Sequence, residues 1–295
     1  MPRRLLPQHP AARAVVGVLC VIGGSIGVQY SVAIVTALFA TVGTYGVNGL
    51  RMLFAGVVLF AIVRPRLRGR TKRAWGHILA FGLAMAAMNV LFYLTVERLP
   101  LGVAVTLEYL GPFAIAVTGV TRRWEMVFPV IALTGVILIS NPGGEMDALG
   151  FAFGIGTAVM FGLYTVLAER VGRHSTGVDG LVLAVAIAAV ALLPFSAEAA
   201  GRVQPSGWFI LAVSGLLGVA LAFTLDFTAV KLVSARVVAT LFSIDPVIGS
   251  LIGVVILGQT LAFGVIVGIV LIVIAGAAVT WLAGRKPRLV IPPAD

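Results

Sequence analysis

The sequence TLEYLGP at residues 106–112 places Glu108 and Tyr109 beside a glycine–proline pair, inside an apolar stretch long enough to span a membrane. A carboxylate at the depth of the bilayer costs about 3 kcal/mol on insertion scales unless it is paired, hydrated or protonated. Interrupted helices are where transporters expose backbone polar groups to a substrate. The stretch therefore predicts the lining of a substrate pathway.

A second stretch of the same kind follows 134 positions later, where residues 240–246 read TLFSIDP. Asp245 again precedes a proline, Pro246, and the threonine, leucine and proline of the first stretch recur at the same spacing. The same chemistry in two apolar segments predicts a duplicated protein.

The composition excludes soluble globular domains, because 60% of the 295 residues are hydrophobic and 11% are charged. The net charge of +10 comes from short basic clusters between apolar runs, which is typical of topology signals and not of nucleic-acid binding. The one cysteine excludes a disulfide framework. We expect an all-α integral membrane protein of the cytoplasmic (inner) membrane, in contact with lipid and with no nucleic-acid partner.

At about 20 residues per span, the apolar runs predict ten transmembrane helices. The expected ranges are 14–36, 44–63, 74–96, 100–120, 125–142, 149–169, 178–196, 207–229, 235–256 and 261–282. Residues 1–13 and 283–295 are then the two tails.

The basic residues provide a check on this count, since lysine and arginine gather in cytoplasmic loops. With both termini in the cytoplasm, 18 of the 21 basic residues fall on the cytoplasmic side, and only Arg98 and Arg202 fall outside. Arg51 lies within the second span. Five helices per half make the second half enter the membrane in the opposite orientation, so we predict inverted repeats over 14–142 and 149–282.

These residues resemble the drug/metabolite transporter superfamily with EamA-type repeats. LEYLGPFAIAV at 107–117 is similar to its threonine/homoserine exporter branch, as are LRM at 50–52, FGLYTVL at 161–167 and SIDP at 243–246. The sequence departs from that branch at Asp245, where a glutamate is usual, and at Gln259, which replaces a glutamate. The resemblance implies secondary-active export of small amino acids or related metabolites.

The charged residues within the predicted spans are the first candidates for the site. We expect Arg51 to pair with Glu108 in the interior of the bundle, although snorkelling of Arg51 and a purely structural ion pair are alternatives. Asp245 is a second candidate, with the alternative that it accepts backbone N–H groups freed by Pro246. Asp226 is interpreted as an interfacial residue, because Lys231 follows it closely.

Three further polar residues, Asn89, Tyr93 and Tyr109, complete the predicted substrate-binding set. For each the alternative is structural, since tyrosines at span ends form interfacial belts and polar side chains join helices. We expect no metal and no cofactor.

The sequence contains no catalytic or nucleotide-binding motif that we can identify, so we expect a secondary transporter and not an enzyme. Export of a zwitterion is favoured, because Glu108 suits an ammonium group and Arg51 a carboxylate. Efflux of hydrophobic or cationic compounds is the alternative, and a membrane-embedded enzyme or structural protein is a remote one.

The charge count also suggests how transport is driven. One arginine neutralises one of Glu108 and Asp245, so the other favours its protonated form in an apolar medium. A proton and a substrate ammonium group then compete for that carboxylate. We expect Glu108 to be the coupling residue of a proton/substrate antiporter.

Overall fold

The computed structural model describes residues 10–117, 123–140, 147–174, 178–233 and 241–285. Every regular element within these ranges is a helix, which confirms the all-α class. The first half contains α1 (Pro10–Val35), η2 (Thr36–Leu38), α2 (Phe39–Val42), α3 (Thr44–Val63), α4 (Lys72–Val96), α5 (Leu101–Val117), η3 (Arg123–Met126) and α6 (Val127–Ser140). The second half contains α7 (Ala148–His174), α8 (Asp179–Ala191), α9 (Leu193–Ala200), α10 (Pro205–Gly215), η4 (Leu216–Leu221), α11 (Ala222–Val233), η5 (Phe242–Ile244), α13 (Asp245–Leu257) and α14 (Phe263–Arg285).

The boundaries of α3 match the predicted range 44–63 at both ends. Gly43, with φ at 84°, separates α3 from the short α2, and this backbone conformation favours glycine. Arg64 adopts a left-handed conformation with φ at 50° and ends the helix before the basic connection to α4. Local sequence therefore determines where the arginine-bearing helix begins and ends.

Two predicted single helices are interrupted in the structure. The range 178–196 is divided between α8 and α9, which meet at an angle of 57°, and Pro194 lies in the first turn of α9, where a proline is tolerated. The range 207–229 contains the π-helical segment η4 between α10 and α11. Such segments are frequent at functional sites.

Five of the described helical segments are long and apolar enough to cross a membrane, and the bent pair α8–α9 would make a sixth. The helices that begin at Leu101, Val127, Phe242 and Phe263 are apolar but shorter over the residues searched. Several membrane-length helices are thus confirmed, and the count of ten stays a prediction. Residues 141–146, Thr240 and most of the predicted tails, at 1–9 and 286–295, lie outside the described residues.

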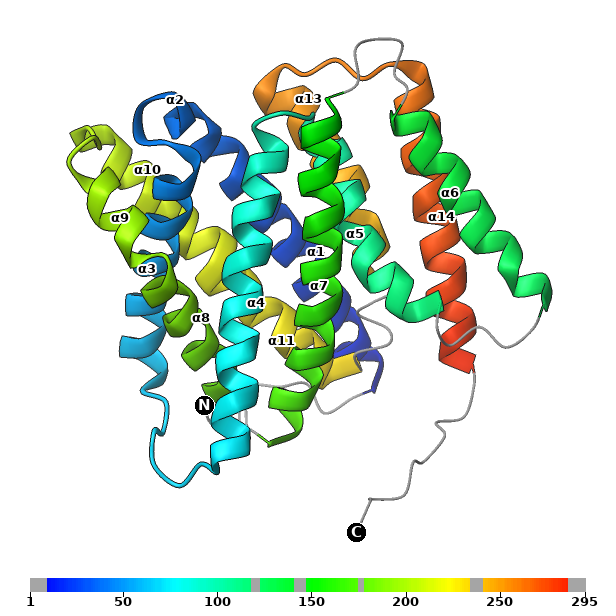
Figure 1. Cartoon of the computed structure of the whole chain (residues 1–295). Helices are drawn as coiled ribbons and strands as arrows, with labels where there is room; N and C mark the ends of the chain where they lie inside the picture. The colour runs from blue at the N-terminus through cyan, green and yellow to red at the C-terminus, as the bar shows by residue number, and fades with distance from the viewer. Residues whose placement is uncertain (1–9, 118–122, 141–146, 175–177, 234–240, 286–295) are drawn as a thin grey trace.

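Figure 1 shows how the helices run between the two ends of the bundle. α1 begins and α14 ends at the same end, where the basic connection between α3 and α4 also lies. α5 packs against α7, α13 and α14, while α6 pairs with α14. The two predicted equivalent stretches, on α5 and around η5–α13, are therefore brought together.

The contact between α5 and α13 is close because small residues form it. A Cβ atom at Gly102 would lie 2.8 Å from the Cα of Ser250, and one at Gly249 would lie 2.8 Å from a methyl group of Val105. Close backbone approach of this kind drives helix association in membranes, where the lipid is as apolar as the side chains.

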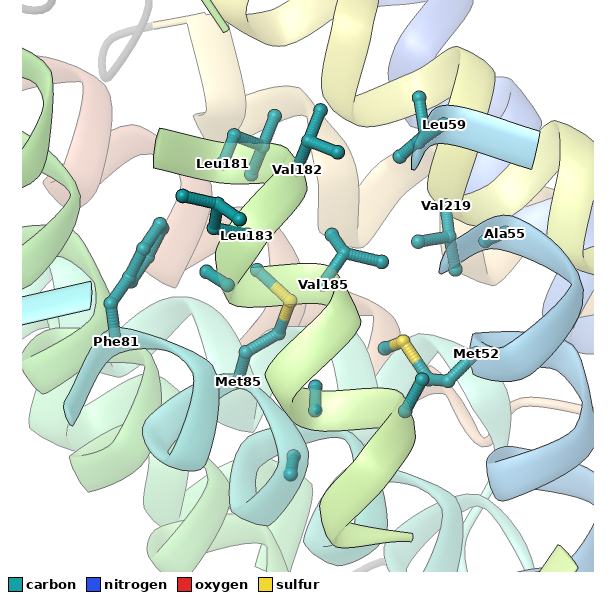
Figure 2. Packing of buried hydrophobic residues seen from close by; sticks show 14 of the residues in the cluster. Met52, Ala55, Leu59, Phe81, Met85, Leu181, Val182, Leu183, Val185 and Val219 are labelled. Carbon is teal, nitrogen blue, oxygen red and sulfur yellow. The ribbon is translucent and has the colours of Figure 1, made fainter. Parts of the chain in front are cut away.

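The largest apolar cluster joins α3, α4, α7, α8 and η4 (Figure 2). Its labelled members in the figure are Met52, Ala55, Leu59, Phe81, Met85, Leu181, Val182, Leu183, Val185 and Val219. This packing fixes α3 against η4, so it determines the position of Arg51.

Candidate functional site

Buried polar residues of α1 contact both charged groups of the interior. Ser25, Gln29 and Ser31 are each at most 4% exposed in an otherwise apolar helix. Ser25 donates a hydrogen bond to Asp245, and Ser31 accepts one from Arg51. The two serines are six residues apart, which is about 9 Å along the helix axis.

Three carboxyl groups from different helices form the first group, which we call the acid cluster: Glu108 on α5, Asp226 on α11 and Asp245 at the start of α13. Asp245 interacts electrostatically with both Glu108 and Asp226. Carboxyl groups that interact in an apolar medium cannot all be ionised without a counter-charge. The cluster can therefore hold a proton or a cationic group.

The position of Asp226 corrects the interpretation of this residue as interfacial. Its Oδ1 atom is buried and has no hydrogen-bond partner among the described residues. A Cβ atom at Gly24 would lie 2.7 Å from that oxygen, so the aspartate packs directly against α1. The contact between α1 and α11, which the sequence does not reveal, brings Asp226 into the interior.

Tyr164 on α7 forms an aromatic border of the acid cluster, and it interacts electrostatically with Asp226 and Glu108. Its ring lies 4.9 Å from that of Phe81 and 5.7 Å from that of Phe161, measured between centroids. The ring of Phe223 lies 6.4 Å from that of Tyr164. Phe81 belongs to the apolar cluster of Figure 2, and Tyr164 and Phe223 pack against that cluster.

Arg51 forms the second charged group, and only 2% of it is exposed. Its Nη2 atom donates to Ser31 over 3.1 Å, and its Cζ atom lies 5.0 Å from the centroid of the Tyr93 ring. Its Nε atom has no hydrogen-bond partner among the described residues. A buried guanidinium in this state is suited to bind an anion, above all a carboxylate, in bidentate geometry.

The prediction that Arg51 pairs with Glu108 is wrong, because the described residues contain no ion pair between them. Among the described residues, the ion pairs are Arg70–Asp179, Arg98–Asp147 and Arg202–Glu198, and all three lie near helix ends. α3 packs mainly against α4, α8, α9, α10 and η4, whereas α5 packs against α7, α13 and α14. The two charged residues therefore belong to different helix neighbourhoods.

The ion pair of Arg98 with Asp147 joins α4 and α7 outside the spans. Asp147 also accepts a hydrogen bond of 2.8 Å from the N–H of Gly150. This hydrogen bond is the main cause that lowers the pKa of Asp147, and the nearby Arg98 adds to it.

The π-helical segment η4 packs against the side chain of Arg51. A Cβ atom at Gly218 would collide with Ser31 Oγ and Arg51 Nη2, so a larger residue does not fit there. One turn earlier, a Cβ atom at Gly215 would lie 2.5 Å from the backbone oxygen of Arg51. Ser214 donates to the backbone oxygen of Ser31 and joins α10 to α1.

The remaining predicted site residues divide between two places. Asn89 and Tyr93 lie one turn apart on α4. Tyr93 is fully buried, and its hydroxyl has no hydrogen-bond partner among the described residues. Asn89 donates to the backbone oxygen of Met85 over 3.0 Å. Tyr109 packs against Gly276 in the apolar cluster between α5, α6 and α14. Tyr93 thus contacts Arg51, and Tyr109 does not belong to that neighbourhood.

Comparisons with known proteins bear on what these groups do. Residues 148–281 match the model of the EamA-like transporter family. The threonine/homoserine exporter RhtA of Salmonella typhimurium (strain LT2) is 29% identical over 268 residues, covering 89% of this chain and 90% of the relative. RhtA of Escherichia coli K12 is 30% identical over 243 residues, covering 79% of this chain and 81% of the relative.

Other similarities extend over most of the chain. The transporter YvbV of Bacillus subtilis is 26% identical over 243 residues, covering 76% of this chain and 78% of the relative. A solved crystal structure with 18% identity has a TM-score of 0.60 and covers 93% of this chain and 98% of that chain. At this identity the structural likeness supports the fold alone.

Proposed function

Since this chain belongs to the EamA-like transporter family of the drug/metabolite transporter superfamily, we propose that it exports small amino acids by secondary active transport. It is a multi-pass membrane protein, and the family makes its partner a small-molecule substrate. The proposed substrates are threonine, homoserine and similar zwitterions, moved out of the cytoplasm and coupled to protons. The similarity to two threonine/homoserine exporters supports these proposed substrates.

The observation that carries the proposal is the isolation of Arg51. A buried cation without an anionic partner is costly, and the structure describes no carboxylate paired with it. A substrate carboxylate would provide the missing charge and a partner for Nε. Ser31 and the Tyr93 ring hold the guanidinium in place for this contact.

The acid cluster supplies the coupling in this proposal. With no described cation beside it, the cluster holds a proton until a substrate ammonium group takes its place. Ser25 already donates to Asp245, so Glu108 is the proposed exchanging group. Each cycle then releases one proton to the cytoplasm as an amino acid binds, and takes up one proton from outside after the amino acid has left.

The proposed topology has ten spans as two inverted repeats, over 14–142 and 149–282, with both termini in the cytoplasm. The contact between α5 and α13 supports it, because inverted repeats place their equivalent interrupted helices together at the site. The start of α1, the end of α14 and the basic α3–α4 connection lie at one end of the bundle (Figure 1). This arrangement agrees with a cytoplasmic side that is rich in arginine and lysine.

A second candidate function is efflux of hydrophobic cations. The aromatic rings of Tyr164, Phe81 and Phe161 beside the acid cluster favour it, because carboxylates and ring faces both attract cations. In that case Arg51 has a structural role.

Tolerance assays separate the two candidates. The protein is expressed in a strain that lacks its own amino-acid exporters, and growth is measured with toxic levels of threonine or homoserine and, separately, with cationic dyes. Export of amino acids predicts tolerance to threonine and homoserine and no change with dyes. The reverse pattern would establish the second candidate.

A further inference from the structure

Asn48 is a buried polar residue that neither the fold nor the proposed transport cycle explains. It lies on α3, is 0% exposed, and its Oδ1 and Nδ2 atoms both have no hydrogen-bond partner in the part of the chain that the structure describes. Buried amides with both polar atoms unpaired are rare in native proteins. Asn48 precedes Arg51 by three residues, so the two side chains are neighbours on one face of the helix.

The contacts on either side of Asn48 show which surface it faces. One turn earlier, Thr44 Oγ1 donates over 2.6 Å to Oε2 of Glu97, the residue that follows α4. One turn later, Arg51 lies over the ring of Tyr93, on α4. Asn48 therefore lies in the row where α3 faces α4, beside the region in which the Tyr93 hydroxyl and Arg51 Nε are also unpaired.

We propose that Asn48 is a specificity-determining residue that hydrogen-bonds the side-chain hydroxyl of a hydroxy amino acid. This inference rests on the proposed function, in which the substrate carboxylate binds Arg51. Arg51 and Asn48 lie one turn apart on the same face of α3, so a substrate held by Arg51 lies beside the amide of Asn48. A hydroxyl both donates and accepts, and the amide of Asn48 offers one acceptor and two donors.

The proposal predicts strong discrimination against substrates without a hydroxyl. Threonine and valine have nearly the same shape, but valine would leave the amide of Asn48 unpaired. A site built to bind a hydroxyl rejects the analogue that lacks it far more strongly than an apolar site can. Homoserine and norvaline form a second pair of this kind.

The experiment measures uptake of labelled threonine and valine, in competition, into inside-out vesicles that contain the full-length protein. The wild type is expected to prefer threonine by about a hundredfold or more. In Asn48→Leu, which keeps the side-chain shape, the preference is expected to fall at least about tenfold. Thr157→Val is the matched control, because Thr157 is buried on α7 and its hydroxyl donates to the backbone oxygen of Phe153 in its own helix.

A ratio of two substrates does not depend on how much protein is folded. If Asn48→Leu gives no measurable uptake, Asn48→Ala is measured in its place, and a lowered ratio supports the proposal. The proposal is overturned if the wild type transports both amino acids equally, or if the folded variants keep the wild-type ratio, as they would if water alone satisfied Asn48. A wild type that transports no amino acid would instead contradict the proposed function.

Discussion

Arg51 and Tyr93 join α3 to α4 in the interior of the bundle, with the arginine Cζ atom 5.0 Å from the centroid of the tyrosine ring. A cation–π contact of this kind contributes about 2 kcal/mol when it is shielded from water. It holds the guanidinium without neutralising it. Arg51 is thereby fixed in position and keeps its capacity to bind an anion.

Replacement of Arg51 by lysine tests this role. Arg51→Lys keeps the positive charge but loses the planar donors that match a carboxylate, so we expect the KM for threonine to rise at least about tenfold, which corresponds to about 1.4 kcal/mol. Arg98→Lys is the control, since Arg98 pairs with Asp147 at a helix end. An unchanged KM in Arg51→Lys would assign this arginine a structural role.

The glycine of the π-helical segment should not tolerate a methyl group. In Gly218→Ala the new Cβ atom would collide with Ser31 Oγ and Arg51 Nη2, so we expect a loss of about 1–3 kcal/mol of stability together with weaker substrate binding. Gly172→Ala on α7 meets no atom within 4 Å and should be neutral. Thermal unfolding in detergent measures both variants, and equal stability of the two would contradict the packing described.

Glu108 and Asp245 should differ in their effect on coupling. Glu108→Gln removes the carboxylate for which the proton and the substrate ammonium group compete, so it should abolish accumulation driven by a pH gradient and weaken exchange of internal for external substrate. Asp245→Asn should chiefly lower folding yield or affinity, because Ser25 already binds that carboxyl group. Reconstituted proteoliposomes measure both activities. If Glu108→Gln kept full dependence on the gradient, another group would have to carry the proton.

The proposed topology predicts where fused reporters are active. Alkaline phosphatase at the C-terminus should be inactive, while a fluorescent protein at the same point should fold and emit. A phosphatase inserted after Arg202, between α9 and α10, should be active, because that connection lies on the opposite side of the membrane in this topology. The reverse pattern would exclude the ten-span arrangement and its inverted repeats.

Helix positions were largely predictable, because apolar runs, glycines and basic clusters are local signals. Gly43 and Arg64 limit α3 at the predicted residues. The bend between α8 and α9 and the π-helical segment at Gly218 were not predicted, since both depend on how neighbouring helices pack. Position 218 requires glycine because the side chains of Ser31 and Arg51, which are distant in the sequence, leave no room for a Cβ atom.

The sequence indicated which residues are candidates for the site, but it did not indicate which of them contact one another. The sequence identifies Arg51 and Glu108 as charges within the predicted spans, but it does not show that their helices have different neighbours. Asp226 was misassigned because Lys231 is near it in the sequence, while its packing partner Gly24 is not. Ser25 and Ser31 were a usable signal, since two polar residues in the apolar α1 indicate a helix that faces polar groups.

The central claim is that this protein couples the export of a small amino acid to protons. The most direct test is uptake of labelled threonine into inside-out vesicles with an acidic lumen. We predict accumulation above the external concentration, abolished by a protonophore and absent from vesicles without the protein. Equilibration without accumulation, or no uptake of threonine, homoserine or any other amino acid tested, would contradict the account.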